Sequence, residues 1–396
     1  MVGRLITWFA ENARDLPWRR TTDPYAVWVS EIMLQQTQVK TVIPFFERWM
    51  AALPDLRALA RISEPELLKL WEGLGYYHRV RRMHQAARRI MEVHDGRFPT
   101  THAEVLDLPG VGEYTAGAIC SIAFNQPEPI LDGNVVRVLA RVLGIRDTVS
   151  TTPVRERLWR EARDLAEVAS RTALPSSWSR RSKETGMVLS GPCSALNQAL
   201  MELGAVACLP RNPRCDICPI RERCICAKEG AQDAIPALPA KVAVTKRAVV
   251  VCVVERGGKF LVRQRAGDVH NSGFWEFPEV VVATKEKPGA ALSRLIGPER
   301  RDFGSESEHE PEHVHVHVGQ VRHSITRYRY TFEIYRVRLD SGKSLPVGGG
   351  LGGAWVSPVE LDKLPLAGPH RKVLAKVRAN PNPGDRSRGG RSAGSK

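Results

Sequence analysis

The stretch Leu-Pro-Gly-Val-Gly-Glu-Tyr-Thr-Ala-Gly-Ala-Ile, residues 108–119, sets the architecture of the first half of this chain. A helical pattern ends just before Pro109, and Gly110 and Gly112 permit a hairpin with positive φ. A second helix is expected to begin near Glu113. Its first amide groups point out of a glycine-rich turn, which is a suitable place to bind a phosphate group.

Helix, glycine hairpin and helix together make a helix-hairpin-helix motif, which binds a DNA backbone without reading the bases. A Gly-x-Gly turn between two helices is also common as a purely structural feature. The sequence Leu-Asp-Gly-Asn-Val follows at residues 131–135 and opens another helix, which Asp132 is expected to cap. A carboxylate held by helix amides stays ionised and can face a developing cation. Asp132 is therefore both a cap and a candidate catalytic residue.

The overall composition suits a polyanionic partner. The 396 residues include 58 lysines and arginines against 43 acidic residues, a net charge of +15. A ribosome-associated protein or a basic enzyme would have the same balance. The chain is long enough for two domains with a core in each. Its most apolar run, residues 248–254, is too short for a membrane span, so we expect a cytoplasmic, nucleoid-associated protein that does not bind membranes.

Residues 1–228 form one helical pattern after another, interrupted at 171–193 by a polar stretch that we expect to be a surface insertion. Glu31 lies in the turns of an apolar stripe formed by Tyr25, Trp28, Val29, Ile32 and Met33. A carboxyl group partly removed from water has a raised pKa, which suits a general acid. On the local pattern alone, a surface glutamate is the simpler interpretation.

The segment Trp-Glu-Gly-Leu-Gly-Tyr-Tyr-His-Arg, residues 71–79, is a second candidate DNA contact. Leu74 and Tyr76 form an apolar pair beside basic residues, and we expect this pair to be exposed. Proteins that distort a duplex insert such wedges between base steps. A helix–helix turn with aromatic packing is the alternative.

Four of the eight cysteines follow the spacing C-x6-C-x2-C-x5-C, at Cys208, Cys215, Cys218 and Cys224. Four thiolates so close together in a cytoplasmic chain indicate a metal site rather than disulfides. The spacing permits either tetrahedral zinc or an iron–sulfur cluster.

The pattern changes after residue 228. Residues 229–245 resemble a Pro/Ala linker, 246–378 alternate between strands and short helices, and 379–396 form a basic tail that we expect to be disordered. Strands are expected at 248–254, 259–264, 272–278 and 328–339. The expected fold class is therefore multidomain, an all-α domain followed by a smaller α/β domain.

These segments in combination resemble the adenine DNA glycosylases of the MutY type, in the helix-hairpin-helix DNA glycosylase superfamily. The matching strings are Leu-Pro-Trp-Arg at 16–19, Asp-Pro-Tyr at 23–25, Ser-Glu-Ile-Met-Leu-Gln-Gln-Thr-Gln-Val at 30–39, Gly-Leu-Gly-Tyr-Tyr at 73–77, the hairpin, 131–135 and the four cysteines. The resemblance implies a two-lobed helical catalytic domain with DNA in its cleft, a 4Fe–4S cluster on the four cysteines, and a Nudix-like C-terminal domain.

The resemblance also implies the reaction, which is hydrolytic removal of adenine mispaired with 8-oxoguanine or guanine in double-stranded DNA. Glu31 would protonate the extruded adenine, Asp132 would stabilise the oxocarbenium-like sugar, and Tyr114 would assist there. Gly110 and Gly112 would contact the DNA backbone. The adenine pocket would be lined by Arg14, Trp18 and Gln198. The gap that the adenine leaves in the duplex would be filled by Gln36, Leu74 and Tyr76.

Tyr114 bears on whether the enzyme also nicks the strand. The related endonuclease III enzymes have a lysine at this position, whose amine forms a Schiff base with the sugar. A tyrosine cannot form one, so we expect a monofunctional glycosylase that leaves an abasic site. Separately, we expect the protein to be a monomer.

The C-terminal domain resembles the Nudix fold through Val-Arg-Gln-Arg at 262–265 and Trp-Glu-Phe-Pro at 275–278. A Nudix hydrolase has a glutamate-rich magnesium motif after that proline, but here Val-Val-Val-Ala-Thr-Lys follows at 280–285. We therefore expect the C-terminal domain to recognise the oxidised guanine. Of the family's Phe-Ser-His loop, only His323 and Ser324 carry over, because Val321 and Arg322 replace its first residues.

Two other functions are compatible with the residues alone. One is a glycosylase for a different mispaired base, such as thymine opposite guanine. The other is a non-catalytic module that binds distorted DNA, for which Glu31→Gln would change nothing.

Overall fold

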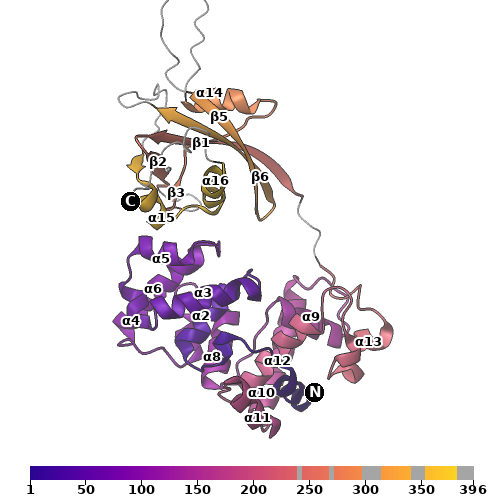
Figure 1. Cartoon of the computed structure of the whole chain (residues 1–396). Helices are drawn as coiled ribbons and strands as arrows, with labels where there is room; N and C mark the ends of the chain where they lie inside the picture. Colours follow the sequence, from indigo (N-terminus) through magenta and orange to yellow (C-terminus); the bar gives the residue numbers. More distant parts are fainter. Residues whose placement is uncertain (239–242, 267–271, 297–313, 340–352, 381–396) are drawn as a thin grey trace, which may run out of the picture. The chain divides into compact units, whose positions relative to one another are not determined.

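The structure, a computed structural model, describes residues 1–238, 243–266, 272–296, 314–339 and 353–380 (Figure 1). Its contacts divide the chain into two compact units, Met1–Ile62 with Tyr76–Ala240 and Ser63–Gly75 with Lys241–Lys396. Residues 239–242 of the expected linker and 381–396 of the expected tail lie outside the described residues. Within the described residues, no helix has the length and apolar character needed to cross a bilayer.

The first unit is helical, as predicted. Helix α12 (Pro192–Val206) makes its main contacts with α1, α8, α9 and α10, and most of its apolar residues are buried. The other helices of the unit are α1 (Val2–Asn12), α2 (Pro24–Leu34), α3 (Val39–Ala52), α4 (Leu56–Arg61), α6 (His78–Val93), α7 (His102–Leu106), α8 (Glu113–Phe124), α9 (Gly133–Val142), α10 (Thr152–Ser170), α11 (Ser177–Thr185) and α13 (Ile225–Glu229).

The hairpin lies between α7 and α8. Gly110 has φ +79°, and a Cβ atom there would lie 2.6 Å from the Cβ of Arg82, so the position requires glycine. Gly112 differs from the prediction, because its φ is −110° and it is the extended N-cap of α8. One left-handed residue is enough to reverse the chain here.

Helix α2 begins as predicted, with the Asp23 carboxylate accepting a hydrogen bond of 3.1 Å from the Tyr25 amide and with Pro24 as first residue. The helix is buried on nearly every side, from Tyr25 to Met33. Glu31 is therefore buried too, with 5% of its surface exposed, and the surface-glutamate interpretation is wrong.

The polar stretch 171–193 contains an unpredicted helix, α11, where we expected irregular surface structure. Trp178 anchors this helix by stacking on Phe9 of α1, at 6.3 Å between ring centroids, and the Arg181 guanidinium donates to the Ala13 carbonyl at 2.6 Å. One buried aromatic residue and one long-range hydrogen bond thus dock a helix that is otherwise polar.

A mixed sheet forms the centre of the second unit, in the order β3-β2-β1-β6-β5. β1 (Thr245–Arg256) runs parallel to β6 (Tyr328–Leu339), which pairs antiparallel with β5 (Val314–Ile325). The smaller strands are β2 (Lys259–Gln264), β3 (Trp275–Glu276), β4 (Glu279–Val281) and β7 (Ala354–Val356). The strand expected at 272–278 is thus limited to two residues, since Gly273 has a positive φ and Pro278 has no amide hydrogen to donate.

Both faces of this sheet are covered by helices (Figure 1). Val249, Val251 and Val253 of β1 face a core completed by α15 (Pro358–Lys363) and α16 (Gly368–Ala379). The alternate residues Val250 and Val254 face a second core completed by α14 (Pro288–Ile296). Burial on both faces explains why β1 is a continuous apolar run rather than an alternating one.

Candidate active site

The helical unit contains a cavity of about 610 Å³. Nine of the predicted DNA-contacting or catalytic residues line it: Arg14, Trp18, Glu31, Gln36, Gly110, Gly112, Tyr114, Asp132 and Gln198. They come from the segment between α1 and α2, from α2 and the turn after it, from the hairpin, α8 and α12, and from the segment that precedes α9. The fold thus brings together residues that are up to 184 positions apart, from 14 to 198.

Glu31 is the most strongly perturbed acid of the cavity. The Tyr114 hydroxyl donates a hydrogen bond to Oε2 of Glu31. Burial raises the pKa of Glu31 to about 7, with the charge of Asp132 adding to the rise and the Tyr114 hydrogen bond and Arg19 opposing it. A carboxylic acid with this pKa retains its proton at neutral pH in a large fraction of molecules, so it can act as a general acid.

Asp132 has surroundings that favour its ionised form more strongly than the surroundings of Glu31 do. As the N-cap of α9, its carboxylate accepts 2.7 Å and 2.9 Å hydrogen bonds from the Val135 amide and the Asn134 side chain. Burial raises the pKa of Asp132 above its usual value, although these hydrogen bonds oppose the rise. The site therefore contains two buried carboxyl groups in different surroundings, Glu31 beside the Tyr114 hydroxyl and Asp132 at the N-terminus of α9.

Close backbone contact places Asp132 beside the hairpin helix. A Cβ atom on Gly117 of α8 would lie 2.1 Å from the Pro129 carbonyl oxygen, so only glycine allows the segment before α9 to lie this close. The Asn197 side chain of α12 fixes the same segment by donating 2.8 Å hydrogen bonds to the Ser121 hydroxyl and the Glu128 carbonyl.

Glu202 is a residue of the cavity that the sequence analysis missed. It is 1% exposed and accepts hydrogen bonds of 2.8 Å from Nε and Nη2 of Arg14 and of 2.9 Å from Arg19. Burial opposes its ionisation, but the two guanidinium groups prevail and lower the pKa of Glu202 to about 2. The sequence signal for Glu202 was its position four residues after Gln198, on the same face of an apolar helix.

Replacing Glu202 with glutamine is expected to reduce the free energy of unfolding by about 3 kcal/mol, because removal of one partner leaves buried charge uncompensated. Chemical denaturation would measure the change. Glu222→Gln is the matched control, since Glu222 makes an ion pair with Arg4 at the surface, where both side chains are mostly exposed. A loss no larger than the control's, which we expect to be less than ~1 kcal/mol, would contradict the structural role of Glu202.

The expected wedge is only partly exposed. Tyr76 is 37% exposed and Leu74 only 6% exposed, and neither residue lines the cavity. The turn folds Leu74 inward, since the indole N–H of Trp71 donates to the Gly75 carbonyl at 3.1 Å and closes the loop. Arg79 stabilises the end of α2 by donating to the carbonyls of Ile32 and Gln35 at 2.6 Å, next to the left-handed Gln36 with φ +58°.

The two residues predicted to contact the lesion lie on β5, in the second unit. His323 is half-buried next to the start of α16, and burial, with Lys372 and His370 nearby, lowers its pKa. Ser324 is exposed and pairs with Arg329 of β6. Both therefore lie near the end of the long β5–β6 hairpin.

One group of potential metal ligands is present among the described residues, namely Glu276, Glu279 and His370. Arginines already neutralise it. Arg265 bonds to both glutamates, at 2.7 Å in the case of Glu279, and Arg263 donates to Glu276 at 2.9 Å. These carboxylates are held by guanidinium groups instead of being available to a divalent cation.

The four predicted metal-binding cysteines line one small cavity beside α9. In the described part of the chain, no three of these sulfur atoms lie within 4.8 Å of one another. Tetrahedral zinc, with Zn–S bonds of about 2.3 Å, needs sulfurs about 3.8 Å apart. The sulfurs are thus spaced more widely than a single tetrahedral zinc requires. The Arg141 guanidinium, 3.3 Å from Cys208 Sγ, would supply positive charge to an iron–sulfur cluster held by these thiolates.

Comparison with known proteins gives matches over most of the chain. Residues 29–164 match the HhH-GPD superfamily base excision DNA repair proteins, 208–224 the iron-sulfur binding domain of endonuclease III, and 249–376 the NUDIX domain. The adenine DNA glycosylase of Rattus norvegicus is 33% identical, over 93% of this chain and 76% of its own length. That of Homo sapiens is 32% identical, over 94% and 73%.

Among solved structures, a thermostable thymine-DNA glycosylase is 27% identical, with a TM-score of 0.48, over 58% of this chain and 95% of its own. The cofactor of segment 208–224 is a 4Fe–4S cluster. Cys208, Cys215, Cys218 and Cys224 would hold it.

Proposed function

The chain belongs to the adenine DNA glycosylases, base-excision-repair enzymes that hydrolyse the N-glycosidic bond of adenine in DNA, and we propose that its substrate is adenine mispaired with 8-oxoguanine or guanine. The observation that supports the proposed chemistry best is the buried Glu31 carboxyl, which is bonded to Tyr114 and close enough to Asp132 to be affected by its charge. General acid, hydroxyl and anion share one cavity, which could accommodate a flipped nucleotide.

In the proposed reaction, Glu31 transfers its proton to N7 of the extruded adenine. The bond between C1′ and N9 then breaks, and its electron pair leaves with the base. The ionised Asp132 stabilises the oxocarbenium-like sugar, and the Tyr114 oxygen assists at the same cation. Water adds its oxygen to C1′ and gives up a proton to a carboxylate of the site, which yields free adenine and an abasic site.

The remaining predicted residues have binding roles in this proposal. Arg14, Trp18 and Gln198 would hold the adenine, with Glu202 keeping Arg14 in place through their bidentate ion pair. Gly110 and Gly112 would present backbone amides to a phosphate. Gln36, Leu74 and Tyr76 would occupy the space that the adenine leaves, and this requires Leu74 to move out of its buried position.

The cluster would have a structural role, holding the cysteine loop as a rigid, basic surface for the DNA backbone. We also propose that the helical catalytic domain spans 1–228, the linker 229–245, the lesion-recognition domain 246–378 and the tail 379–396, and that the protein acts on DNA as a cytoplasmic monomer. The guanidinium groups that neutralise Glu276 and Glu279 support recognition rather than metal-dependent hydrolysis in the C-terminal domain.

A duplex with one adenine opposite 8-oxoguanine, labelled at one end, tests the reaction. We expect cleavage at the adenine only after hot alkali, because Tyr114 cannot form the Schiff base that a lyase needs. Strand breaks without alkali, or a covalent adduct trapped by borohydride, would contradict a monofunctional enzyme. If folded protein leaves this duplex intact but cleaves one with thymine opposite guanine, the assignment to adenine is wrong.

We further expect His323→Ala to reduce the preference for adenine opposite 8-oxoguanine over adenine opposite guanine by about tenfold, through loss of a polar contact to the lesion. The ratio of single-turnover excision rates on the two duplexes measures this preference. His317→Ala is the control, since His317 lies on the same strand, in contact with Glu333 at 2.9 Å. An unchanged ratio in the His323 variant would rule out its role.

A further inference from the structure

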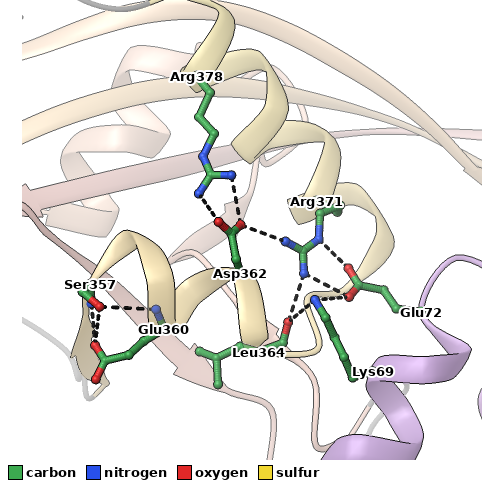
Figure 2. A network of polar contacts seen from close by, with 8 residues as sticks. All are labelled: Lys69, Glu72, Ser357, Glu360, Asp362, Leu364, Arg371 and Arg378. Carbon is green, nitrogen blue, oxygen red and sulfur yellow. Dashed lines mark hydrogen bonds and ion pairs between the residues drawn. The ribbon is translucent and has the colours of Figure 1, made fainter. Parts of the chain in front are cut away.

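The segment Ser63–Gly75 belongs to the same compact unit as the C-terminal sheet, although it lies far from that sheet in sequence. It contains helix α5 (Glu64–Trp71) and the turn with Leu74. Figure 2 shows the polar network that connects this segment to α15 and α16. The network contains a residue pair, Glu72 and Arg371, that the proposed function has not used.

Glu72 is the centre of this network on the α5 side. Its carboxylate accepts a bidentate pair of hydrogen bonds from Arg371, at 2.5 Å and 2.9 Å, and a further one from Lys69 at 3.0 Å. Lys69 and Arg371 also both donate to the Leu364 carbonyl, at 3.1 Å and 3.0 Å. The contact thus involves backbone as well as side chains, which fixes its geometry.

The network continues into the C-terminal helices. Asp362 of α15 lies 3.8 Å from Arg371 and binds Arg378 of α16 at 2.9 Å and 3.1 Å. Only 11% of the Glu72 side chain and 32% of the Arg371 side chain are exposed. A bidentate, partly buried ion pair within a network contributes measurably to stability, unlike an isolated ion pair at the surface.

The position of Glu72 in sequence connects the network to the turn that contains Leu74. Glu72 is the C-cap of α5 and immediately precedes the turn that holds Leu74. On the other side, α16 starts at Gly368, where an added Cβ would lie 3.6 Å from the ring of His323, and Arg371 follows one turn later. The same helix therefore contacts the strand with His323 and the residue that holds the turn.

We propose that the Glu72–Arg371 pair is a positioning contact by which the lesion-recognition strand controls the Leu74 turn, so that adenine is excised faster opposite 8-oxoguanine than opposite guanine. This inference rests on the proposed function. Helix α16 transmits the state of His323 to Arg371, and Arg371 sets where Glu72, and with it the turn, is held. Neither residue of the pair touches the reacting atoms.

Charge reversal tests the contact. The measured quantity is the single-turnover rate of adenine excision opposite 8-oxoguanine divided by the rate opposite guanine. Glu72→Arg and Arg371→Glu are each expected to lower this ratio by about tenfold, and the double variant should restore it to within about threefold of the wild-type value. Glu286→Arg and Arg294→Glu are the matched controls, because they break a 3.0 Å ion pair of the same unit that lies outside the network. Both controls should keep the wild-type ratio.

Hydrogen exchange provides a readout without DNA. Each single reversal should accelerate exchange of the amides in residues 63–75, and the double variant should restore protection. If single variants keep the wild-type ratio, or if the double variant simply adds the two losses, the inference is wrong while the proposed function stands. If the wild-type enzyme excises adenine equally fast from both duplexes, the inference is wrong even where exchange shows the contact. If folded wild-type enzyme excises adenine from neither duplex, the proposed function fails, and the inference falls with it.

Discussion

Glu31→Gln is expected to lower the rate of adenine excision by about 10³-fold or more, since the variant loses its general acid. Glutamine has the same size and can still accept the hydrogen bond of the Tyr114 hydroxyl, so the cavity should keep its shape. It has no acidic proton to transfer to the base. Single-turnover kinetics with the 8-oxoguanine duplex, and binding measured on the same duplex, separate lost chemistry from lost affinity.

The pH dependence of the wild-type rate provides the second part of this prediction. Burial raises the pKa of Glu31 to about 7, so the protonated form is abundant at lower pH and becomes scarce as the pH rises. Excision should therefore fall above about pH 7, approaching a tenfold loss per pH unit. A rate that stays constant up to pH 9, or a Glu31→Gln variant with near-normal turnover, would assign the acid to another group.

Asp132→Asn is expected to slow excision by about 10²–10³-fold, the usual effect of removing one preorganised group that stabilises transition-state charge. Asparagine is an equally good N-cap, and its oxygen can still accept from the Val135 amide. The free energy of unfolding should therefore change by less than ~1 kcal/mol. Excision kinetics and chemical denaturation of the same preparation test both halves of this prediction.

Asp55→Asn is the matched control. Asp55 is also an N-cap, of α4, and accepts a 2.8 Å hydrogen bond from the Ala58 amide, but it does not line the cavity. Its variant should keep the wild-type excision rate. If Asp132→Asn does the same, Asp132 is only a helix cap.

Much of the fold could be predicted because its signals are local. Asp23 with Pro24 starts α2, the hairpin separates α7 from α8, and the run 248–254 forms the centre of β1. Each depends on backbone conformation or on a repeat of apolar residues within a few positions. The resemblance to known glycosylases then indicated which residues of distant segments would share one cavity.

Other features depend on packing between distant segments. The burial of Glu31, the inward turn of Leu74 and the docking of α11 by Trp178 all differ from what the local patterns suggested. The ion pairs of Glu202 with Arg14 and of Glu72 with Arg371 join residues that are 188 and 299 positions apart.

The physical reason for this division is the range of the interactions. Caps, turns and helical periodicity act within about one or two helical turns of chain, so neighbouring residues reveal them. The pKa of a carboxyl group and the exposure of an apolar side chain depend instead on every atom that surrounds them, whichever part of the chain supplies it. Those surroundings exist only once the helices of the first unit, and the sheet and helices of the second, have packed.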